Sequence, residues 1–332
     1  MVAIAVSSLF EKRTGQSLSL PNIPNEVMPM ARVQALCSPC EHRSPAELME
    51  PFAYLCQLPG KDIRSRMVDA YNVWLQVDPA ILDLVKKVVT MLHNGSLLVD
   101  DIEDHSQMRR GAPVAHAIFG EPLTINCANY TYFLALELVH NTGNPKAVKV
   151  FVDELLNLHR GQGWDIYWRD NYECPSLDMY KQMVLDKTGG LLRLAVKLMQ
   201  AFSTFGGNLI TLTNSIGLYY QIRDDYINLA SEAYMENKSY CEDLTEGKFS
   251  YPIIHAIQAN PADRRLMHIL KQRTGDVNIK KHAVEYIESV GSLAHTKAVL
   301  KELETEIADE IQKLGGNGKL EMILQYLMTN LV

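Results

Sequence analysis

Two runs of acidic residues are the feature of this sequence that most clearly suggests chemistry. DDIED (100–104) and DDYIN (224–228) lie 124 positions apart (224 − 100), and each ends an apolar stretch with helical spacing. Residues four positions apart share one face of an α-helix, so the first and last members of each run point the same way. Carboxylates together with substrate phosphates are the ligands that Mg²⁺ prefers. The pattern predicts two oxygen-rich helix faces that hold a polyphosphate between them through bridging metal ions.

Basic residues lie where a diphosphate would need them. Arg109 and Arg110 follow the first acidic run within two helical turns, and Gly111 is predicted to end the helix there. Lys61 and Arg64 share a face at a predicted helix start, where backbone N–H groups add affinity for anions. Each pair by itself is also typical of a solvated surface, but a negatively charged substrate accounts for the metals and the arginines together.

Two further places on apolar helices could face the same cavity. The segment KTGG (187–190) interrupts an apolar helix with paired glycines, which weaken a helix. A break there would bring the Thr188 hydroxyl and nearby backbone into the cavity, and a kink made for packing is the alternative. His93 lies two turns before Asp100 on nearly the same face, and an ordinary buried histidine is the alternative for it.

Helices are the elements that must position these residues. From residue 46 onwards, apolar residues recur at three- and four-residue spacing, and period-two runs typical of strands are almost absent. Turn residues separate the periodic segments. Helices are predicted at 62–76, 80–104, 122–140, 146–163, 176–204, 207–230, 249–258, 263–272, 277–290, 292–313 and 319–331. The fold predicted is all-α, a single large bundle of ten or more helices around a deep central cavity.

The first part of the chain has a different character. Five prolines between positions 21 and 45 interrupt any helical pattern, so residues 1–45 are predicted to form an irregular arm or linker. Residues 46–332 then form the all-helical domain. The CxxC sequence at 37–40 has no second pair of cysteines, and we expect the six cysteines to be free thiols in a reducing compartment.

Composition excludes several classes of function. The chain has 332 residues, is 47% hydrophobic and can bury a large core. Its net charge of −7 argues against a nucleic-acid binder. No stretch approaches the ~18 apolar residues of a transmembrane helix, and no basic residue precedes the short apolar run near the N-terminus. We therefore expect a cytoplasmic protein.

The chain resembles the trans-isoprenyl diphosphate synthases, specifically the eukaryotic, fungal-type geranylgeranyl diphosphate synthases. The resemblance covers residues 46 to about 330. The segments that carry it are LLVDDIEDHSQMRRGAPVAH (97–116), GQGWDIYWRD (161–170), DKTGG (186–190), YQIRDDYIN (220–228) and CEDLTEGKFSYPIIHAI (241–257). The prenyltransferase domain of fungal bifunctional terpene synthases is similar as well, so the chain is either a stand-alone enzyme or such a domain.

This resemblance implies a role for individual residues. Three Mg²⁺ ions on the allylic diphosphate would be held by Asp100, Asp101, Asp104 and Asp224, with Asp225 and Asn228 behind the metals. The allylic substrate would contact Arg109, Lys187, Thr188, Gln221, Lys238 and Lys248. Isopentenyl diphosphate would be held by Lys61, Arg64, His93 and Arg110. The second acidic run ends in asparagine rather than aspartate, a change that this group commonly shows.

The implied reaction is an ionisation, a condensation and an elimination that give geranylgeranyl diphosphate (C20). Mg²⁺ and cationic side chains stabilise the charge on the leaving diphosphate. Helical walls shield the allylic cation from water, Thr188 and nearby carbonyls stabilise it through their dipoles, and the alkene of isopentenyl diphosphate attacks it before a proton is lost. Farnesyl diphosphate or a shorter allylic diphosphate would serve as the primer.

Product length is expected to depend on the residues around the growing chain. Gly95 and Ser96 lie one turn before Asp100, where farnesyl-producing relatives carry aromatic bulk, so elongation beyond C15 is predicted. Tyr132 and Phe133 on the following helix are candidates for the cavity floor near C20. The alternative for these two is ordinary aromatic core.

Two other functions remain as alternatives. A class I terpene cyclase would also use an aspartate-rich helix, but its Asn-x₃-Ser/Thr-x₃-Glu metal motif is absent from 205–240. A non-catalytic subunit of a heteromeric synthase usually loses one aspartate motif, and both are intact here. Members of the family are homodimers or higher assemblies, and the predicted helices 122–140 and 146–163 are expected to supply the interface.

Overall fold

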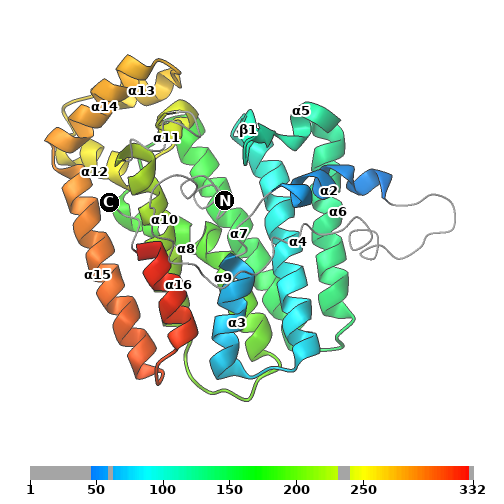
Figure 1. The fold of residues 1–332 in the computed structure, drawn as a ribbon. Coiled ribbons are helices and arrows are strands. Elements are labelled where there is room, and N and C mark those ends of the chain that lie inside the picture. Colours follow the sequence, from blue (N-terminus) through cyan, green and yellow to red (C-terminus); the bar gives the residue numbers. More distant parts are fainter. Residues whose placement is uncertain (1–45, 59–62, 231–239, 329–332) are drawn as a thin grey trace, which may run out of the picture.

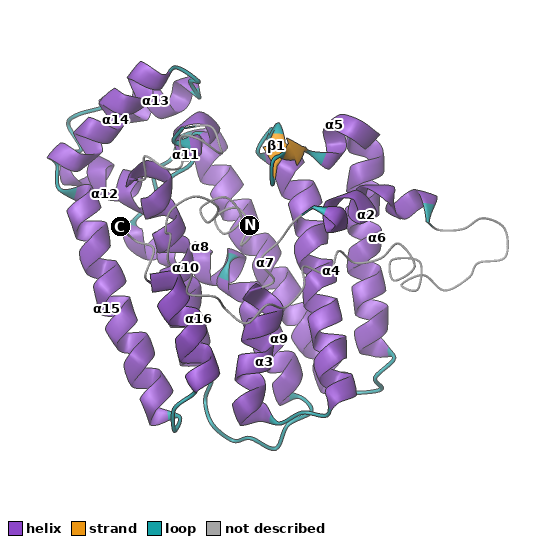
Figure 2. Cartoon of the chain, in the orientation of Figure 1, coloured by secondary structure: helices purple, strands orange, loops and turns teal. Residues whose placement is uncertain are grey.

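Apolar residues at helical spacing form helices along nearly all of the chain that the computed structural model describes, which is residues 46–58, 63–230 and 240–328 (Figures 1 and 2). The predicted all-α fold is confirmed. The helices, in chain order, are η1 (Glu47–Met49), α2 (Glu50–Gln57), α3 (Ile63–Leu75), α4 (Pro79–Glu103), α5 (Ala115–Phe119), α6 (Glu121–His140), α7 (Pro145–Asn171), α8 (Leu177–Lys187), α9 (Gly189–Gln200), α10 (Ile210–Ala230), α11 (Glu242–Glu246), α12 (Tyr251–Ala259), α13 (Arg265–Gln272), α14 (Val277–Ser289), α15 (Ser292–Lys313) and α16 (Gly318–Met328).

The long helices pack side by side and carry the functional residues. α4 contacts α3, α6 and α9, α7 contacts α6, α8 and α9, and α10 contacts α8, α9 and α15. α4 begins sharply because the Asp78 carboxylate accepts a hydrogen bond from the Ala80 N–H at 2.8 Å and proline occupies the first helical position. Fully buried side chains such as Tyr71, Leu97 and Ile222 belong to one continuous apolar core between these helices. None of the described helices is long and apolar enough to cross a membrane.

Two glycines bring helix backbones together at the break between α8 and α9. A Cβ atom added to Gly161 of α7 would lie 2.4 Å from the backbone nitrogen of Lys187. A Cβ added to Gly217 of α10 would lie 2.9 Å from the Cα of Gly189. Since real Cβ atoms never approach so closely, α7 and α10 close on the break from two sides only because both positions are glycine.

A short hairpin follows α4 and corrects one prediction. β1 (Met108–Arg109) pairs antiparallel with β2 (Ala112–Pro113), and the two residues between them have positive φ, 54° at Arg110 and 79° at Gly111. Two consecutive residues with positive φ are typical of a tight hairpin turn. The helix therefore ends at Glu103, not at Gly111, and both arginines project from a hairpin.

Other helix boundaries also differ from the predictions. α7 continues eight residues beyond the predicted 146–163 segment, to Asn171 (171 − 163), and the predicted 176–204 helix is divided at Thr188 into α8 and α9. The short helices α2, α5 and α11 span only 8, 5 and 5 residues, too few to give a periodic signal.

Candidate active site

The first acidic run lies at the C-terminal end of α4, buried among cations from other elements. Asp100 and Asp101 have exposed fractions of 0% and 1%. Arg109 of the hairpin donates from Nε to Oδ1 of Asp101 at 2.8 Å, and its Nη2 lies 3.5 Å from Oδ2 of Asp100. Arg169 of α7 donates to Asp104 at 2.5 Å. Because isolated buried charges are strongly unfavourable, these pairs are what allow three carboxylates to gather here.

The second acidic run lies on α10 and divides into an inner and an outer carboxylate. Asp225 is 1% exposed and accepts hydrogen bonds from the Tyr180 hydroxyl and from the backbone N–H of Tyr251, the latter at 2.8 Å. Asn228 is also turned inward, and its Oδ1 accepts from the backbone N–H of Asp243 at 3.3 Å. Asp224 is only half-buried and lines a small polar pocket.

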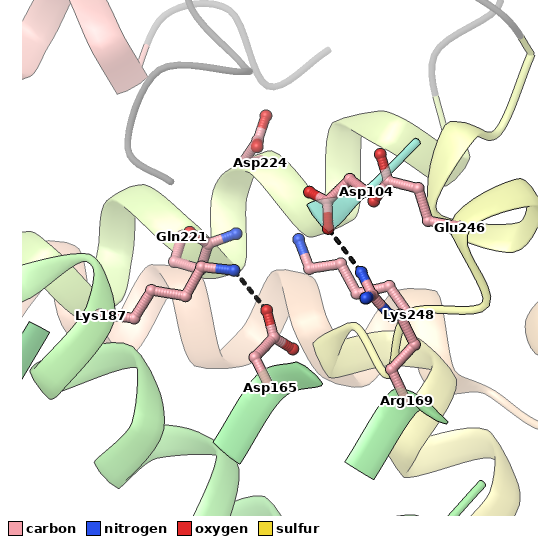
Figure 3. Close-up of a pocket in the computed structure, with 8 residues that line it drawn as sticks. All are labelled: Asp104, Asp165, Arg169, Lys187, Gln221, Asp224, Glu246 and Lys248. Carbon is pink, nitrogen blue, oxygen red and sulfur yellow. Dashed lines mark hydrogen bonds and ion pairs between the residues drawn. The ribbon is translucent and has the colours of Figure 1, made fainter. Parts of the chain in front are cut away.

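That polar pocket brings the two acidic runs together (Figure 3). Asp104 at the C-terminal cap of α4 and Asp224 of α10 lie on its wall, although they are 120 positions apart in the sequence (224 − 104). The other residues that line it are Asp165, Arg169, Lys187, Gln221, Glu246 and Lys248. Acidic and basic side chains of four helices, of the residue that follows α4 and of the segment after α11 therefore line one pocket, which is the chemistry expected of a site for a charged group held by cations.

The break between α8 and α9 supplies Lys187 to this pocket and connects Thr188 to Gln221 of the pocket wall. The Lys187 ammonium donates to Asp165, and although burial lowers the pKa of Lys187, Asp165 and Asp100 hold it above its ordinary value, so the side chain stays charged. The Thr188 hydroxyl donates to Oε1 of Gln221 at 2.7 Å. The Gln221 amide in turn donates to Asp225 at 2.9 Å. A chain of hydrogen bonds thus connects the helix break to the second acidic run.

A second group of basic residues gathers around His93. The His93 ring is 5% exposed, and neither of its nitrogens has a hydrogen-bond partner among the described residues. Burial, together with the charges of Arg64 and Arg110, holds the pKa of His93 well below its ordinary value, so the ring is neutral. Arg110 donates from Nη1 to the Leu58 carbonyl at 3.3 Å. Lys61, predicted to belong to the same group, lies outside the described residues, as does Lys238 of the allylic set.

An apolar cavity of about 240 Å³ extends between α4, α6, α7 and α9. Ser96 lines it on α4 and Tyr132 on α6, and the Tyr132 ring packs edge-on against His159 of α7 with 5.9 Å between ring centroids. Gly95 lies directly against the tyrosine, because a Cβ there would be 3.1 Å from Tyr132 Cε1. Phe133 was predicted to share the floor, but its side chain is 69% exposed and turned away from the cavity.

Sequence reasoning missed several residues of the site. Gln162 of α7 donates to Glu103 at 2.6 Å and lies 3.5 Å from Asp100. Asp165 and Arg169 follow it at three and seven positions, so the three share one face of α7. Their spacing is the signal that could have identified them. Glu246 and His159 were also missed, and an isolated histidine or glutamate on a helix carries no comparable pattern.

The donor set fits divalent cations bound together with a substrate. Within the described ranges, no three Asp, Glu, His or Cys side chains surround a point closely enough to form a complete protein cage. Mg²⁺ does not need one, since it usually binds through one or two carboxylates, waters and substrate phosphates. Oδ2 of Asp101 is buried and accepts no hydrogen bond from the described residues. Burial and the neighbouring Asp100 raise the pKa of Asp104 to about 6, a strain that a bound cation would relieve.

Comparisons with known proteins agree with this geometry. The family model described as polyprenyl synthetase matches residues 45–287. A terpene synthase of Matsumurasca onukii is 53% identical over 282 residues, covering 85% of this chain and 93% of that protein. A geranylgeranyl pyrophosphate synthase of Dictyostelium discoideum is 50% identical over 285 residues, covering 86% and 94%. A copalyl diphosphate synthase of Talaromyces verruculosus is 50% identical over 276 residues, which are 83% of this chain but 29% of that longer protein.

The extent of these matches decides the family. The family model spans 243 residues (287 − 45 + 1) of the 332, and the relatives match at about half identity over most of the chain. The resemblance identified from the acidic runs and the KTGG segment is therefore confirmed. The chain belongs to the polyprenyl synthetase family and is a prenyltransferase.

Proposed function

We propose that the protein condenses isopentenyl diphosphate with an allylic diphosphate, farnesyl or shorter, to form geranylgeranyl diphosphate. The observation that supports this proposal is the combination of a polar pocket, a group of basic residues around His93 and an apolar cavity, which His93 also lines. The polar pocket around Asp104 and Asp224 suits the allylic diphosphate, and the group around His93 suits the second diphosphate. The cavity beside Ser96 suits the growing hydrocarbon.

The pocket's own side chains act on the leaving diphosphate. Lys187 and Lys248 line the pocket, and each carries a charge that can donate to phosphate oxygens as the C–O bond breaks. Arg109 lies beside Asp100 and Asp101 and can turn one or more of its N–H groups toward the same diphosphate. Asp100, Asp101, Asp104 and Asp224 would hold three Mg²⁺ ions, which supply positive charge to the departing group when bound.

The second subsite would hold the nucleophilic substrate. Arg64 and Arg110 provide positive charge near the neutral His93 ring. A neutral imidazole can donate one hydrogen bond to a phosphate oxygen without adding repulsion to the two guanidinium groups. Lys61 would complete this set.

The helix break would stabilise the allylic cation and exclude water. The Thr188 hydroxyl is 3% exposed by residue, and its oxygen lone pairs and the carbonyls freed at the break are dipoles that can face a carbocation. The apolar wall formed by Leu158, Leu191 and Val99 keeps water from the cation. The proton lost at the end passes to the released diphosphate, so this scheme needs no side-chain nucleophile.

Product length follows from the small residues of α4. Ser96 leaves the cavity open one turn before Asp100, so the chain can grow beyond C15, and Gly95 lets the Tyr132 ring lie directly against α4. Tyr132 and His159, which pack edge-to-face across the cavity, are the groups best placed to stop it near C20. Phe133 has no part in this floor.

A terpene synthase is the second candidate, because the Matsumurasca onukii relative with 53% identity carries that name. A cyclase or a diphosphate lyase acts on one substrate and has no use for a second diphosphate site. The arginines around His93 favour the condensing enzyme. This chain covers 29% of the Talaromyces verruculosus relative. A third candidate is therefore that the chain is the prenyltransferase domain of a longer enzyme, with residues 1–45 as its arm or linker.

We further propose that the chain forms a homodimer or higher homo-oligomer through α6 and α7. These helices expose large apolar side chains, with exposed fractions of 41% at Ile125, 69% at Phe133, 51% at Leu156 and 51% at Trp164. Adjacent helices that leave such residues uncovered commonly meet a second protein surface. A dimer interface there would cover them.

The deciding experiment is a product analysis. The purified protein is incubated with Mg²⁺ and farnesyl diphosphate, with and without isopentenyl diphosphate. We expect C20 diphosphate only when both substrates are present. A hydrocarbon formed from farnesyl diphosphate alone would establish the terpene synthase instead, and no turnover under any condition would indicate a non-catalytic subunit.

A further inference from the structure

A network of buried charges lies outside the reaction pocket and joins four helices. Arg193 of α9 is 7% exposed, and Glu154 of α7 is fully buried. Nε of Arg193 donates to Oε2 of Glu154 at 2.8 Å. Its Nη1 donates to the backbone carbonyl of Leu185 in α8 at 2.9 Å and to Oδ1 of Asn214 in α10 at 3.2 Å. Its Nη2 also lies 3.9 Å from Oδ1 of Asp186 in α8, so groups from three neighbouring helices fix the guanidinium.

The carbonyl that Arg193 contacts belongs to the end of α8. In an uninterrupted helix, the Leu185 carbonyl would accept a hydrogen bond from the N–H of residue 189. The helix is interrupted at Thr188, whose N–H bonds to the Val184 carbonyl at 2.8 Å, and a new helix begins at Gly189. A carbonyl left without its helical donor in a buried place costs about 1–3 kcal/mol unless another group donates to it. Arg193 supplies that donor.

The same guanidinium lies against the two glycines of the break. A Cβ atom added to Gly189 would lie 3.8 Å from Nη1 of Arg193, and one added to Gly190 would lie 3.9 Å from Nη2. Arg193 thus contacts the interrupted segment and does not itself line the pocket. Between the Leu185 carbonyl and these glycines, Lys187 lines the pocket and Thr188 donates a hydrogen bond to Gln221 of the pocket wall.

We propose that Arg193 is a positioning residue for prenyl transfer, and this inference rests on the proposed roles of Lys187 and Thr188. Its guanidinium replaces the missing helical hydrogen bond and holds the α8–α9 break in the shape that presents the Lys187 ammonium and the Thr188 hydroxyl to the pocket. Arg193 itself touches neither substrate. Its effect passes through the backbone of residues 185–190.

Arginine is required at this position because its acceptors lie in different directions. The planar guanidinium reaches Glu154, Leu185 and Asn214 at the same time, whereas a lysine ammonium on a single flexible stem cannot keep all three contacts. Glu154 keeps a positive partner when Arg193 is replaced, because Lys197 donates to its other carboxylate oxygen at 2.5 Å. A conservative substitution at Arg193 therefore leaves the Glu154 charge paired.

The test compares Arg193→Lys with the matched control Lys197→Gln in the full-length protein. Lys197→Gln removes one cationic contact to Glu154 and leaves the donor to the Leu185 carbonyl in place, whereas Arg193→Lys cannot keep the contacts to Glu154, Leu185 and Asn214 together. We expect Arg193→Lys to lower kcat/KM for the allylic substrate by about 10- to 100-fold, the loss typical of slightly misplaced catalytic groups. The KM for isopentenyl diphosphate should stay within about twofold of the wild-type value, and Lys197→Gln should change both quantities by less than about threefold.

A double-mutant cycle with Lys187→Gln separates positioning from a general loss of structure. If Arg193 acts through Lys187, then Arg193→Lys should add less than about threefold to the loss caused by Lys187→Gln. Binding of inorganic pyrophosphate with Mg²⁺, measured by calorimetry, should weaken in Arg193→Lys and not in Lys197→Gln. Multiplicative losses in the cycle, or equal effects of the two single variants, would overturn the inference. A wild-type protein with no prenyl transfer would instead overturn the proposed function, and the pyrophosphate measurement would still test Arg193.

Discussion

Replacing Ser96 by phenylalanine should shorten the product from C20 to C15. Ser96 lies on α4 one turn before Asp100, and it lines the apolar cavity. Its hydroxyl donates to the His93 carbonyl of the same helix at 2.8 Å, so the side chain lies close to the helix and leaves the cavity open. A phenyl ring at this position would enter the cavity at the point that the fourth isoprene unit must pass.

The change in the ratio of C20 to C15 product follows from the part of the hydrocarbon that would no longer be buried in the cavity. A C20 chain has five more carbons than a C15 chain, and burial stabilises each CH₂ group by about 0.8 kcal/mol, so the last unit contributes about 4 kcal/mol. Loss of half or all of this contribution changes the ratio of C20 to C15 product by roughly 30- to 700-fold, at about 1.4 kcal/mol per factor of ten. The variant should therefore release C15 diphosphate almost exclusively.

The assay supplies geranyl diphosphate with isopentenyl diphosphate and identifies the alcohols after the diphosphate is removed. Ser96→Ala is the control, because it removes the hydroxyl without adding bulk, and it should still give C20. Formation of C15 at close to the wild-type rate would show that the Ser96→Phe pocket is intact. If Ser96→Phe still gave mainly C20 at the wild-type rate, the growing chain would not pass this residue, and the assignment of the cavity would be wrong.

Three further predictions concern the acidic pocket, the helix contact and the assembly. Asp224→Ala should lower kcat by about 100- to 1,000-fold in a steady-state assay with saturating Mg²⁺, and a smaller change than tenfold would contradict its role. Gly161→Ala should lower the free energy of unfolding by about 1–3 kcal/mol because its Cβ would overlap the backbone of α8. The control Gly163→Ala, whose Cβ would meet no described atom within 4 Å, should be neutral or stabilising, as read from denaturant unfolding. Phe133→Glu should reduce the sedimenting mass toward that of the monomer, whereas Val277→Glu should not, and an unchanged assembly would remove α6 from the interface.

The helical fold could be predicted because its signal is repeated in every turn. α4 buries Val85, Val88, Val89 and Leu92 at spacings of three and four residues, so its periodicity is unambiguous. The predicted segment 80–104 differs from the observed Pro79–Glu103 by one residue at each end. The acidic runs were recognisable for a related reason, since adjacent carboxylates on an apolar helix have no role in a core.

The contribution of α7 to the site was harder to predict. Beyond residue 163 its buried face carries Asp165 and Arg169, whose charges interrupt the apolar pattern and made the helix appear to end. These residues are buried because they pair with charges on α4 and α8, for example Arg169 with Asp104. Only the folded chain brings those partners together. In the sequence, the charged residues of a buried site therefore look the same as charged residues on a solvated surface.

The hairpin and the cavity floor were mispredicted for local reasons. The strands around Arg110 are two residues each, too short to show an alternating pattern, and the tight turn depends on a positive φ that arginine rarely adopts. Tyr132 and Phe133 are adjacent, so they point about 100° apart around α6, and the sequence gives no reason to prefer one over the other. The structure turns the tyrosine inward and leaves the phenylalanine exposed.

The glycine contacts at the α8–α9 break also determine which parts of the site can change shape to accept substrates of different length. Backbone meets backbone at Gly161 and Gly217, and main-chain atoms, unlike rotatable side chains, have no alternative conformers with which to make room. The polar pocket beside the break thus keeps a fixed shape, whatever the length of the substrate's hydrocarbon chain. Variation among substrates must be absorbed along α4 and α6, where Tyr132 and its neighbours can change rotamer. In laboratory evolution toward products of new chain length, substitutions should therefore accumulate along α4 and α6, and Gly161 and Gly217 should remain unchanged.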